Sequence, residues 1–366
     1  MNKTALKAQQ GFEKQFGAVP EHLIRAPGRV NLIGDHTDYS GGFVMPVALE
    51  QAVWLALRPR EDQRVVLHSL DYVETTELNL SKSLEKGKGW QEYLKGISWV
   101  LQETGWQLSG WEGVVTGDIP QGAGLSSSAA LEMACLRAFA EVSVIYWNPQ
   151  TAAKLAQRAE TEWVGVSCGI MDQLISACGI AGHALLIDCQ NLDIKPVKLP
   201  TGLKIIILDT KSRRGLVDSL YNERFSQCLD ASAIFGKSLL REVSLTELEA
   251  KSSLLSPLLY RRALHVISEN KRVRHAAKAM NNNDLELVGQ LMQESHLSLR
   301  DNFEVSSSAL DLMVEHALSA PGCLGARMTG AGFGGCAVAV VKTELENDFI
   351  NYFQDVVSKN QSINHE

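Results

Sequence analysis

The stretch Pro120-Gln-Gly-Ala-Gly-Leu-Ser-Ser-Ser-Ala-Ala-Leu-Glu132 places a glycine-rich turn directly before a run rich in Ala, Leu and Met. This pattern predicts a helix over Ser127–Val142 with the serines in its first turn. The free N–H groups and the dipole of a helix N-terminus bind phosphate, and glycine lets the backbone approach such a ligand. The Walker A lysine is missing, although serine hydroxyls can ligate Mg²⁺. A plain glycine turn with a serine N-cap is the alternative.

A second stretch, Arg25-Ala-Pro-Gly-Arg-Val-Asn-Leu-Ile-Gly-Asp-His-Thr-Asp-Tyr-Ser-Gly-Gly42, gathers ionisable side chains in a glycine-containing segment. Four of them fall within ten residues, too densely for a core strand: Arg29, Asp35, His36 and Asp38. A fixed array of carboxylates and an imidazole suits the recognition of several hydroxyl groups, as in a sugar. A solvated polar turn is the alternative for this stretch taken alone.

A third stretch, Gly325-Ala-Arg-Met-Thr-Gly-Ala-Gly-Phe-Gly-Gly-Cys336, carries four glycines within six residues between two apolar runs. Such a segment can close over a bound phosphate, and a glycine-rich hairpin is an equal alternative. Two backbone-rich anion loops and one hydroxyl-binding loop together predict phosphoryl transfer to a polyol.

The chain has 366 residues, with 35 Lys plus Arg, 42 Asp plus Glu and a formal charge of −7. The length suggests two domains, and the acidic balance argues against a general nucleic-acid binder. Apolar runs such as Cys336–Val341 are far too short for a membrane span, and residues 1–16 lack the apolar core of a secretory signal. Seven cysteines without a CxxC pair support neither zinc nor disulfides, so we expect a reduced, cytoplasmic protein.

Hydrophobic patterning predicts a mixed chain of strands and helices. We expect strands at 29–33, 43–48, 52–57, 65–68, 113–116, 184–188 and 203–209, and a helix at 149–164. Later helices are expected at about 217–235, 258–281, 284–300, 307–319 and 344–359, with a strand–turn–strand unit over 326–341. The polar segment 189–201 is the expected boundary between an N-terminal domain of residues 1–190 and a C-terminal domain of residues 191–366.

The three stretches resemble the signature motifs of the galactokinases, a family of the GHMP kinase superfamily. Other segments have family counterparts in the same order: Trp90–Gly96, Glu160–Gln173, His183–Cys189, Asp218–Asn222, Arg261–Val266 and Ser295–Val305. The resemblance runs from about residue 8 to 358, and so many ordered motifs make it highly specific. It implies a two-domain α+β fold with the active site in the cleft between the domains.

The resemblance also implies an activity. Members of the family phosphorylate the anomeric (C1) hydroxyl of galactose with ATP, giving galactose 1-phosphate and ADP in the first committed step of the Leloir route. The implied cofactors are ATP and Mg²⁺. The implied partners are a small sugar and ATP, without nucleic acid or membrane, in a monomer or weak homo-oligomer.

By the same resemblance, Asp172 is the general base and Arg29 is its electrostatic neighbour. The sugar hydroxyls are assigned to Asp35, His36, Asp38, the Gly169 backbone and Tyr221. The phosphates are assigned to Gly122, Ala123, Gly124, Leu125, Ser126, Ser127 and Ser128, Mg²⁺ to Ser127 and Glu160, and adenine to Trp90 and Tyr93. These roles agree with chemistry, because a carboxylate can accept the proton of a sugar hydroxyl and Mg²⁺ prefers hard oxygen ligands.

Each role has a structural rival. Asp172 can be a helix cap, Glu160 a charge on a helix surface, and Arg29 a purely structural ion-pair partner. Trp90 and Tyr93 have the i, i+3 spacing of helical core residues. Packing or internal pairing is expected for three further residues that match the family: His183, Arg300 and Glu304.

Two positions depart from the family pattern: Asp35 stands where glutamate is usual, and Leu220 replaces a commonly acidic residue. We therefore expect a relaxed sugar pocket that tolerates C6 or C2 variants of galactose. An N-acetylgalactosamine or galacturonate kinase is the rival enzyme, and a non-catalytic sugar sensor is the rival from another class. The complete Ser126–Ala130 segment and the presence of Asp172 argue against a sensor.

Overall fold

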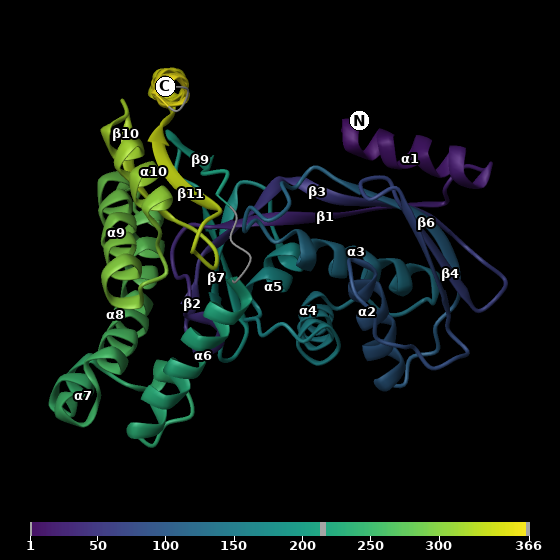
Figure 1. Ribbon diagram of the computed structural model, residues 1–366, viewed down its shortest axis with the longest axis horizontal. Coiled ribbons are helices and arrows are strands. Elements are labelled where there is room, and N and C mark those ends of the chain that lie inside the picture. Colours follow the sequence, from purple (N-terminus) through teal and green to yellow (C-terminus); the bar gives the residue numbers. More distant parts are fainter. Residues whose placement is uncertain (1, 213–216, 364–366) are drawn as a thin grey trace. The chain divides into compact units, whose positions relative to one another are not determined.

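The computed structural model describes residues 2–212 and 217–363, and its chain forms two compact units (Figure 1). Unit 1 comprises Met1–Arg29, Ala48–Gln121 and Leu125–Gly179. Unit 2 comprises Val30–Val47, Gly122–Gly124 and Ile180–Glu366. The chain thus enters unit 2 twice before residue 180. The units therefore do not correspond to one division of the chain at a single position. The predicted domain boundary between residues 190 and 191 stays a prediction.

Unit 1 is a sheet with helices on both faces. Its strands lie in the order β3 (Pro46–Pro59), β6 (Trp111–Gly117), β4 (Arg64–Ser69) and β5 (Glu74–Asn79), and β1 (His22–Asn31) also pairs with β3. The β4–β6 pair is parallel, whereas β3–β6 and β4–β5 are antiparallel. Its helices are α1 (Lys3–Phe16), α2 (Gln91–Glu103), α3 (Ser127–Val142), α4 (Pro149–Arg158) and α5 (Met171–Cys178).

Helix α1 covers one face of this sheet, and Figure 1 shows α2 to α5 on the other. The side chain of Asn2 caps α1 by accepting from the backbone N–H groups of its first turn. Ala8 and Phe12 on α1 pack against Ala56 of β3 and Val114 of β6. The apolar face of α1 therefore stabilises the sheet by burial.

Unit 2 contains two groups of antiparallel strands. One is the sheet β10 (Cys323–Met328), β11 (Cys336–Lys342) and β9 (Leu203–Asp209), and the other joins β2 (Phe43–Val44), β7 (His183–Asp188) and β8 (Asp193–Lys198). The helices are α6 (Val217–Ile234), α7 (Leu245–Ala250), α8 (Pro257–Asn281), α9 (Leu285–Ser298), α10 (Ser308–Ser319) and α11 (Glu346–Ile363). Helix α9 approaches β10 so closely that a Cβ at Gly289 would lie 2.1 Å from the Leu324 carbonyl oxygen.

The observed elements confirm most of the expected ones. Helix α3 begins at Ser127, where the serine-rich stretch predicted it. The expected helix at 149–164 is α4 followed by a π-helix, Ala159–Val164. Strand β8 lies within the polar segment 189–201, where no strand was predicted. Pro196 is tolerated there since β8 pairs only with β7 among the described strands.

Two exclusions made from composition can be compared with the described residues. No helix in residues 2–212 and 217–363 is both long and apolar enough to cross a membrane. All seven cysteines are free thiols. Helices α1, α2, α5 and α7 and strand β5 were not predicted.

Candidate active site

Asp172 and Arg29 face each other in unit 1. Asp172 lies in the first turn of α5, after the N-cap residue Ile170, and Arg29 lies near the end of β1. The guanidinium donates from Nε to Oδ1 at 2.8 Å and from Nη2 to Oδ2 at 2.7 Å. The Arg29 side chain is 7% exposed and that of Asp172 is 30% exposed. The carboxylate is thus oriented by a planar fork yet stays accessible to a substrate hydroxyl.

Ser126 joins the serine-rich stretch to this ion pair. Its backbone has φ 61 and ψ 46, a left-handed conformation uncommon outside glycine. Its hydroxyl does not cap α3 but donates to Asp172 Oδ2. The N–H groups of Ser127 and Ser128 begin α3 and have no intrahelical acceptors, the arrangement that binds phosphate. Gly169 is buried in the segment just before α5.

A buried group of acidic and amide side chains surrounds Glu160, which lies in the π-helix, a conformation frequent at functional sites. Gln173 Nε2 donates to Glu160 Oε2 at 2.7 Å and to Glu132 Oε2 at 3.3 Å. Burial raises the pKa of Glu160 to about 7, against hydrogen bonds that lower it. Burial also raises the pKa of Glu132, and the charge of Glu160 adds to this rise.

This group fits a divalent cation with hard oxygen ligands. Ser127 and Glu160 offer a hydroxyl and a carboxylate, and Mg²⁺ commonly takes few protein ligands. Glu132 Oε1 is buried and has no hydrogen-bond partner among the described residues. A positive charge beside these two carboxylates would offset the cost of burying them. The described part of the chain holds no group of three His, Cys, Asp or Glu placed to bind a metal.

Trp90 and Tyr93, the predicted adenine contacts, lie at the start of α2. The Trp90 indole donates to Glu74 Oε2 at 2.9 Å and stacks on Tyr72 with ring centroids 5.9 Å apart. Trp90 is buried and Tyr93 is partly buried. One face of the indole is therefore covered by the protein, which supports the rival packing role, and the adenine contact stays a prediction.

In unit 2, Asp35 binds the glycine loop, which we define as residues 329–335. Its Oδ1 accepts from the Gly330 N–H at 3.2 Å, and its Oδ2 lies 2.7 Å from Arg327 Nη2. The Asp35 side chain is 2% exposed and that of Arg327 is 0% exposed. Any sugar contact made by Asp35 is therefore additional to an enclosed ion pair, and it stays a prediction.

His36 also contacts the glycine loop. Its Nε2 lies 3.1 Å from the Ala331 carbonyl oxygen, and its Nδ1 lies 2.9 Å from the Tyr39 hydroxyl. Because a carbonyl only accepts, Nε2 carries the proton and Nδ1 accepts from Tyr39. Burial, with a smaller contribution from His265, lowers the pKa of His36 to about 3. The ring is thus neutral near pH 7.

Asp38 and Tyr221 are only partly buried. Asp38 begins the 3₁₀ turn Asp38–Ser40 (η1), and Tyr221 lies on α6. The Tyr221 ring centroid lies 5.3 Å from that of His36 and 5.3 Å from that of Tyr39. The structure therefore brings Tyr221 together with the residues of the second stretch, as the sugar assignment requires.

Two glycine-rich segments pack backbone to backbone in unit 2. A Cβ at Gly330 would lie 3.0 Å from the Gly124 carbonyl oxygen, and one at Gly335 would lie 2.9 Å from that of Ala123. Gly330 and Gly335 have φ of 81 and 82. Only glycine combines this conformation with so close an approach. Residues 122–124 and the glycine loop therefore form one continuous backbone surface.

Sequence reasoning missed the polar roles of Gln173, Glu132 and Arg327. Each stands within a quoted motif, but the prediction assigned roles to neighbouring residues of that motif instead. The available signal was a long polar side chain in an otherwise apolar element, which usually has a buried partner. The expected internal pairing is confirmed for two residues: Arg300 pairs with Asp301, and Glu304 pairs with Arg261 and Arg262.

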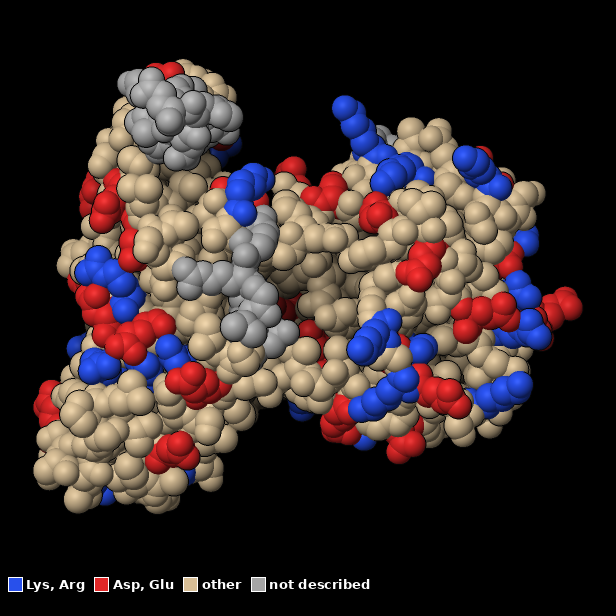
Figure 2. Space-filling model, viewed as in Figure 1, with Lys and Arg blue, Asp and Glu red and all other residues tan. Residues whose placement is uncertain are grey.

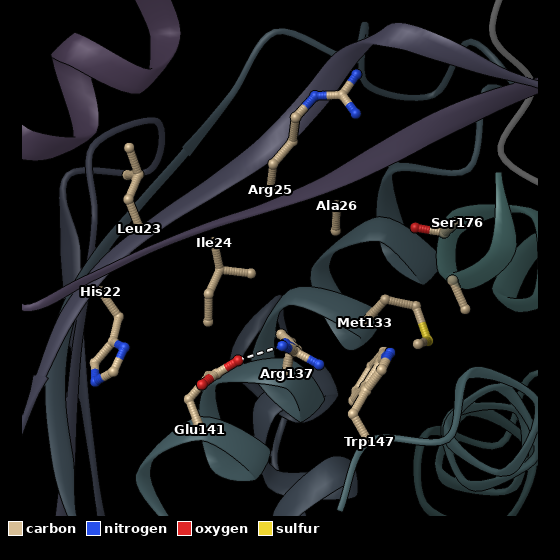
Figure 3. A pocket seen from close by; sticks show the side chains of 11 residues that line it. His22, Leu23, Ile24, Arg25, Ala26, Met133, Arg137, Glu141, Trp147 and Ser176 are labelled. Carbon is tan, nitrogen blue, oxygen red and sulfur yellow. Dashed lines mark ion pairs between the residues drawn. The ribbon is translucent and has the colours of Figure 1, made fainter. Parts of the chain in front are cut away.

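A separate hollow of about 390 Å³ lies in unit 1 (Figure 3). It is lined by His22–Ala26 of β1, by residues of α3 and α5, and by Trp147. In it, Arg137 pairs with Glu141 and lies 4.8 Å from the Trp147 ring centroid. This hollow contains none of the predicted site residues.

The face shown in Figure 2 carries charged side chains of both signs. Lys and Arg are interspersed with Asp and Glu, and the described residues of this face carry no basic stripe. A basic stripe is the surface feature typical of a nucleic-acid binder.

Three family models match the chain: the galactokinase galactose-binding signature at residues 10–59, the GHMP kinases N terminal domain at 92–180 and the GHMP kinases C terminal model at 276–357. A galactokinase of Chloroflexus aggregans is 44% identical, over 93% of this chain and 88% of its own length. The chain belongs to the galactokinase family. Another family member, a galactokinase of Roseiflexus sp., is 40% identical over 97% of this chain and 93% of its own length.

Solved structures agree with this membership. The Lactococcus lactis galactokinase complexed with galactose matches with a TM-score of 0.90 and 34% identity, covering 96% of this chain and 94% of that one. The Methanococcus jannaschii mevalonate kinase has a TM-score of 0.66 at 20% identity, which shows a shared fold. The two-domain α+β GHMP kinase fold implied by the sequence motifs is confirmed.

Proposed function

We propose that this galactokinase family member transfers the γ-phosphoryl group of ATP to the C1 hydroxyl of galactose, giving α-galactose 1-phosphate and ADP. The observation that carries the proposal is the Arg29–Asp172 pair. It places an accessible, oriented carboxylate in the unit that also contains the N-terminus of α3. Through this reaction the chain begins galactose catabolism by the Leloir route.

Asp172 acts as the general base, because its carboxylate can accept the proton of the C1 hydroxyl as the phosphoryl group is transferred. Arg29 holds both carboxylate oxygens, and Ser126 donates to Oδ2, so the carboxylate has one defined orientation. The guanidinium also offsets negative charge on the transferring group. The first N–H groups of α3 and the backbone of residues 122–128 bind the phosphates.

Ser127 and Glu160 would hold Mg²⁺, which would supply positive charge to offset that of the phosphate oxygens. Gln173 orients the Glu160 carboxylate by a hydrogen bond. Trp90 and Tyr93 offer aromatic faces to adenine. We also propose that the protein acts in the cytoplasm as a monomer or weak homo-oligomer.

The sugar hydroxyls are bound by Asp38, Tyr221 and the Gly169 backbone, together with Asp35 and His36. Galactose at this site enters an environment in which His36 is neutral and Asp35 already carries an arginine partner. Aspartate in place of the usual glutamate shortens the reach of this carboxylate by one methylene. Somewhat relaxed discrimination among C6 and C2 variants follows from this substitution.

The proposal is tested by measuring ADP release with galactose and ATP. We expect galactose-dependent release, little release with glucose as the control sugar, and loss of release when EDTA removes Mg²⁺. NMR of the product should couple the phosphorus to the anomeric proton. Release of ADP that does not depend on a sugar, or phosphate on another hydroxyl, would refute the proposal.

A further inference from the structure

We infer that Arg241 is a positioning residue that sets the affinity for the sugar by holding the turn that follows Asp38. The inference rests on the proposed function and extends it to a residue that does not touch substrate. Arg241 lies in the 3₁₀ turn Leu240–Glu242 (η3) of unit 2. Both Arg241 and its partner Asp188 fall outside the residues matched by the three family models.

Arg241 joins a backbone carbonyl and a carboxylate. Its Nη1 donates to the Gly41 carbonyl oxygen at 2.9 Å. The same guanidinium donates to Asp188 Oδ1 at 2.9 Å and Oδ2 at 2.7 Å, a two-bond contact that fixes its plane. The side chains of Arg241 and Asp188 are only 21% and 13% exposed, so water screens this contact weakly. Burial opposes ionisation of Asp188, yet the bonds from Arg241 hold its pKa below the usual value.

The guanidinium also stacks on an aromatic ring of the same segment. Arg241 Cζ lies 4.0 Å from the Phe43 ring centroid, a cation–π distance. Phe43 in β2 is the register partner of Asp188 in β7. The Gly42 carbonyl accepts from the Cys189 N–H at 2.9 Å. Arg241 therefore contacts Gly41 and Phe43, the two residues that flank the Gly42–Cys189 backbone hydrogen bond.

This contact reaches Asp38 through Gly41. The Gly41 N–H donates to the Asp38 carbonyl at 3.1 Å, which closes η1, and Gly41 has the left-handed φ of 68. The carbonyl of Gly41 is held by Arg241, so this residue is fixed from both sides. Loss of the Arg241 contact frees the Gly41 carbonyl to rotate and lets the Asp38 turn shift. A misplaced binding residue weakens ground-state binding more than the chemical step.

The test compares two arginine variants that share a target ring. Arg241→Met removes the carbonyl, carboxylate and ring contacts. Arg274→Met is the matched control, because Arg274 also lies over the Phe43 ring, at 5.4 Å, with no bond to the Gly41 carbonyl or Asp188 among its described contacts. The measurements are kcat, KM for galactose, KM for ATP and the calorimetric Kd of galactose without ATP.

We expect Arg241→Met to raise the galactose KM and Kd about tenfold, with the ATP KM within about twofold of wild type. Arg274→Met should change the galactose constants by less than about threefold. Arg241→Lys, which keeps the charge but not the two-bond geometry, should fall between wild type and Arg241→Met. A galactose KM within about twofold of wild type in Arg241→Met, or an equal rise in both KM values, would overturn the inference.

If Arg241→Met fails to fold, Arg241→Lys and Asp188→Asn decide the question. Both should raise the galactose KM selectively by a few fold, and unchanged or unselective KM values overturn the inference. Failure of the proposed function looks different: wild-type protein would then release no ADP with galactose. In that case the galactose Kd of the variants still tests the role of Arg241.

Discussion

Two arginine–aspartate pairs in this molecule use the same chemistry for different ends. Arg29–Asp172 in unit 1 leaves the carboxylate 30% exposed, and a serine hydroxyl is its further partner. Arg327–Asp35 in unit 2 is enclosed, with exposures of 0% and 2%, and the carboxylate also accepts from the backbone of the glycine loop. The first pair leaves its carboxylate accessible to a substrate hydroxyl, whereas the second fixes Asp35 against the glycine loop of unit 2.

The difference shows that residue type and motif membership do not distinguish an aspartate that can react with a substrate from one that stabilises the fold. Asp35 and Asp172 both belong to motifs of the family, and both were assigned to the site from sequence. Exposure and the identity of the remaining partners distinguish them. A carboxylate that must accept a proton needs access to the substrate, and a carboxylate that must hold a loop needs a donor from that loop and an enclosed counter-charge.

The largest expected effect is at Asp172. Asp172→Asn keeps the shape of the side chain but removes the proton acceptor, so kcat should fall by at least about 10³-fold. Binding of ATP, measured by calorimetry, should stay within about threefold of wild type. Glu162→Gln is a matched control on the same unit, because Glu162 pairs with Arg158 at an exposed position. Near-normal turnover of Asp172→Asn would show that the base is assigned wrongly.

The second effect concerns stability. Arg327→Met leaves the Asp35 carboxylate buried without its ion-pair partner, so unfolding should become easier by about 3–5 kcal/mol. The exposed pair Arg300–Asp301 supplies the control, since Arg300→Met should change stability by less than about 1 kcal/mol. Denaturant titrations measure both values. Equal losses in the two variants would remove the distinction between the enclosed pair and an exposed one.

The third effect is the pH dependence of stability. Burial lowers the pKa of His36 to about 3, and of His265 and His296 to about 4. Between about pH 6.5 and 4 the unfolded chain therefore binds protons at these rings and the folded chain does not. Stability should fall with decreasing pH in this window, by about 1.4 kcal/mol per unit for each ring.

Unfolding midpoints measured from pH 7.5 to 4.5 test this expectation. His296→Gln should remove about one ring's share of the slope, because its amide does not titrate. A slope unaffected by His296→Gln would contradict the neutral, buried state of this ring.

The smallest effect concerns sugar choice. Because Asp35 is shorter than the usual glutamate and already bound to Arg327, loss of the galactose C6 hydroxyl should lower kcat/KM only several-fold. Galactose, its 6-deoxy form, galacturonate and N-acetylgalactosamine form the panel. Exclusive use of galactose would reject the relaxed pocket.

Particular elements show which parts of the fold could be predicted from the sequence. Helix α3 and its start at Ser127 followed from local composition, and the strand–turn–strand unit β10–β11 followed from alternating apolar runs and glycines. Strand β8 was missed because Pro196 and its polar neighbours resemble a linker. A strand at the edge of a sheet tolerates proline and polar residues, because it needs backbone hydrogen bonds to a neighbouring strand on one side only.

The candidate site was predictable in its residues but not in its contacts. The motifs named Asp172, Arg29 and Ser126, yet no local pattern shows that the Ser126 hydroxyl does not cap α3 and donates to Asp172 instead. The roles of Gln173 and Arg241 were not predicted, because their partners, Glu160 and Gly41, are not adjacent to them in the sequence. Such contacts are fixed by tertiary packing, which a single sequence does not reveal.

The most direct measurement compares turnover and stability for Asp172→Asn and Arg327→Met side by side. If Asp172 serves the reaction and the Arg327–Asp35 pair serves stability, the two variants should differ in turnover. Asp172→Asn should lose turnover by at least about 10³-fold while its folded molecules still bind ATP within about threefold of wild type. Arg327→Met should lose about 3–5 kcal/mol of stability while each folded molecule keeps turnover within about tenfold. Retained turnover in Asp172→Asn, or unchanged stability in Arg327→Met, would contradict the account.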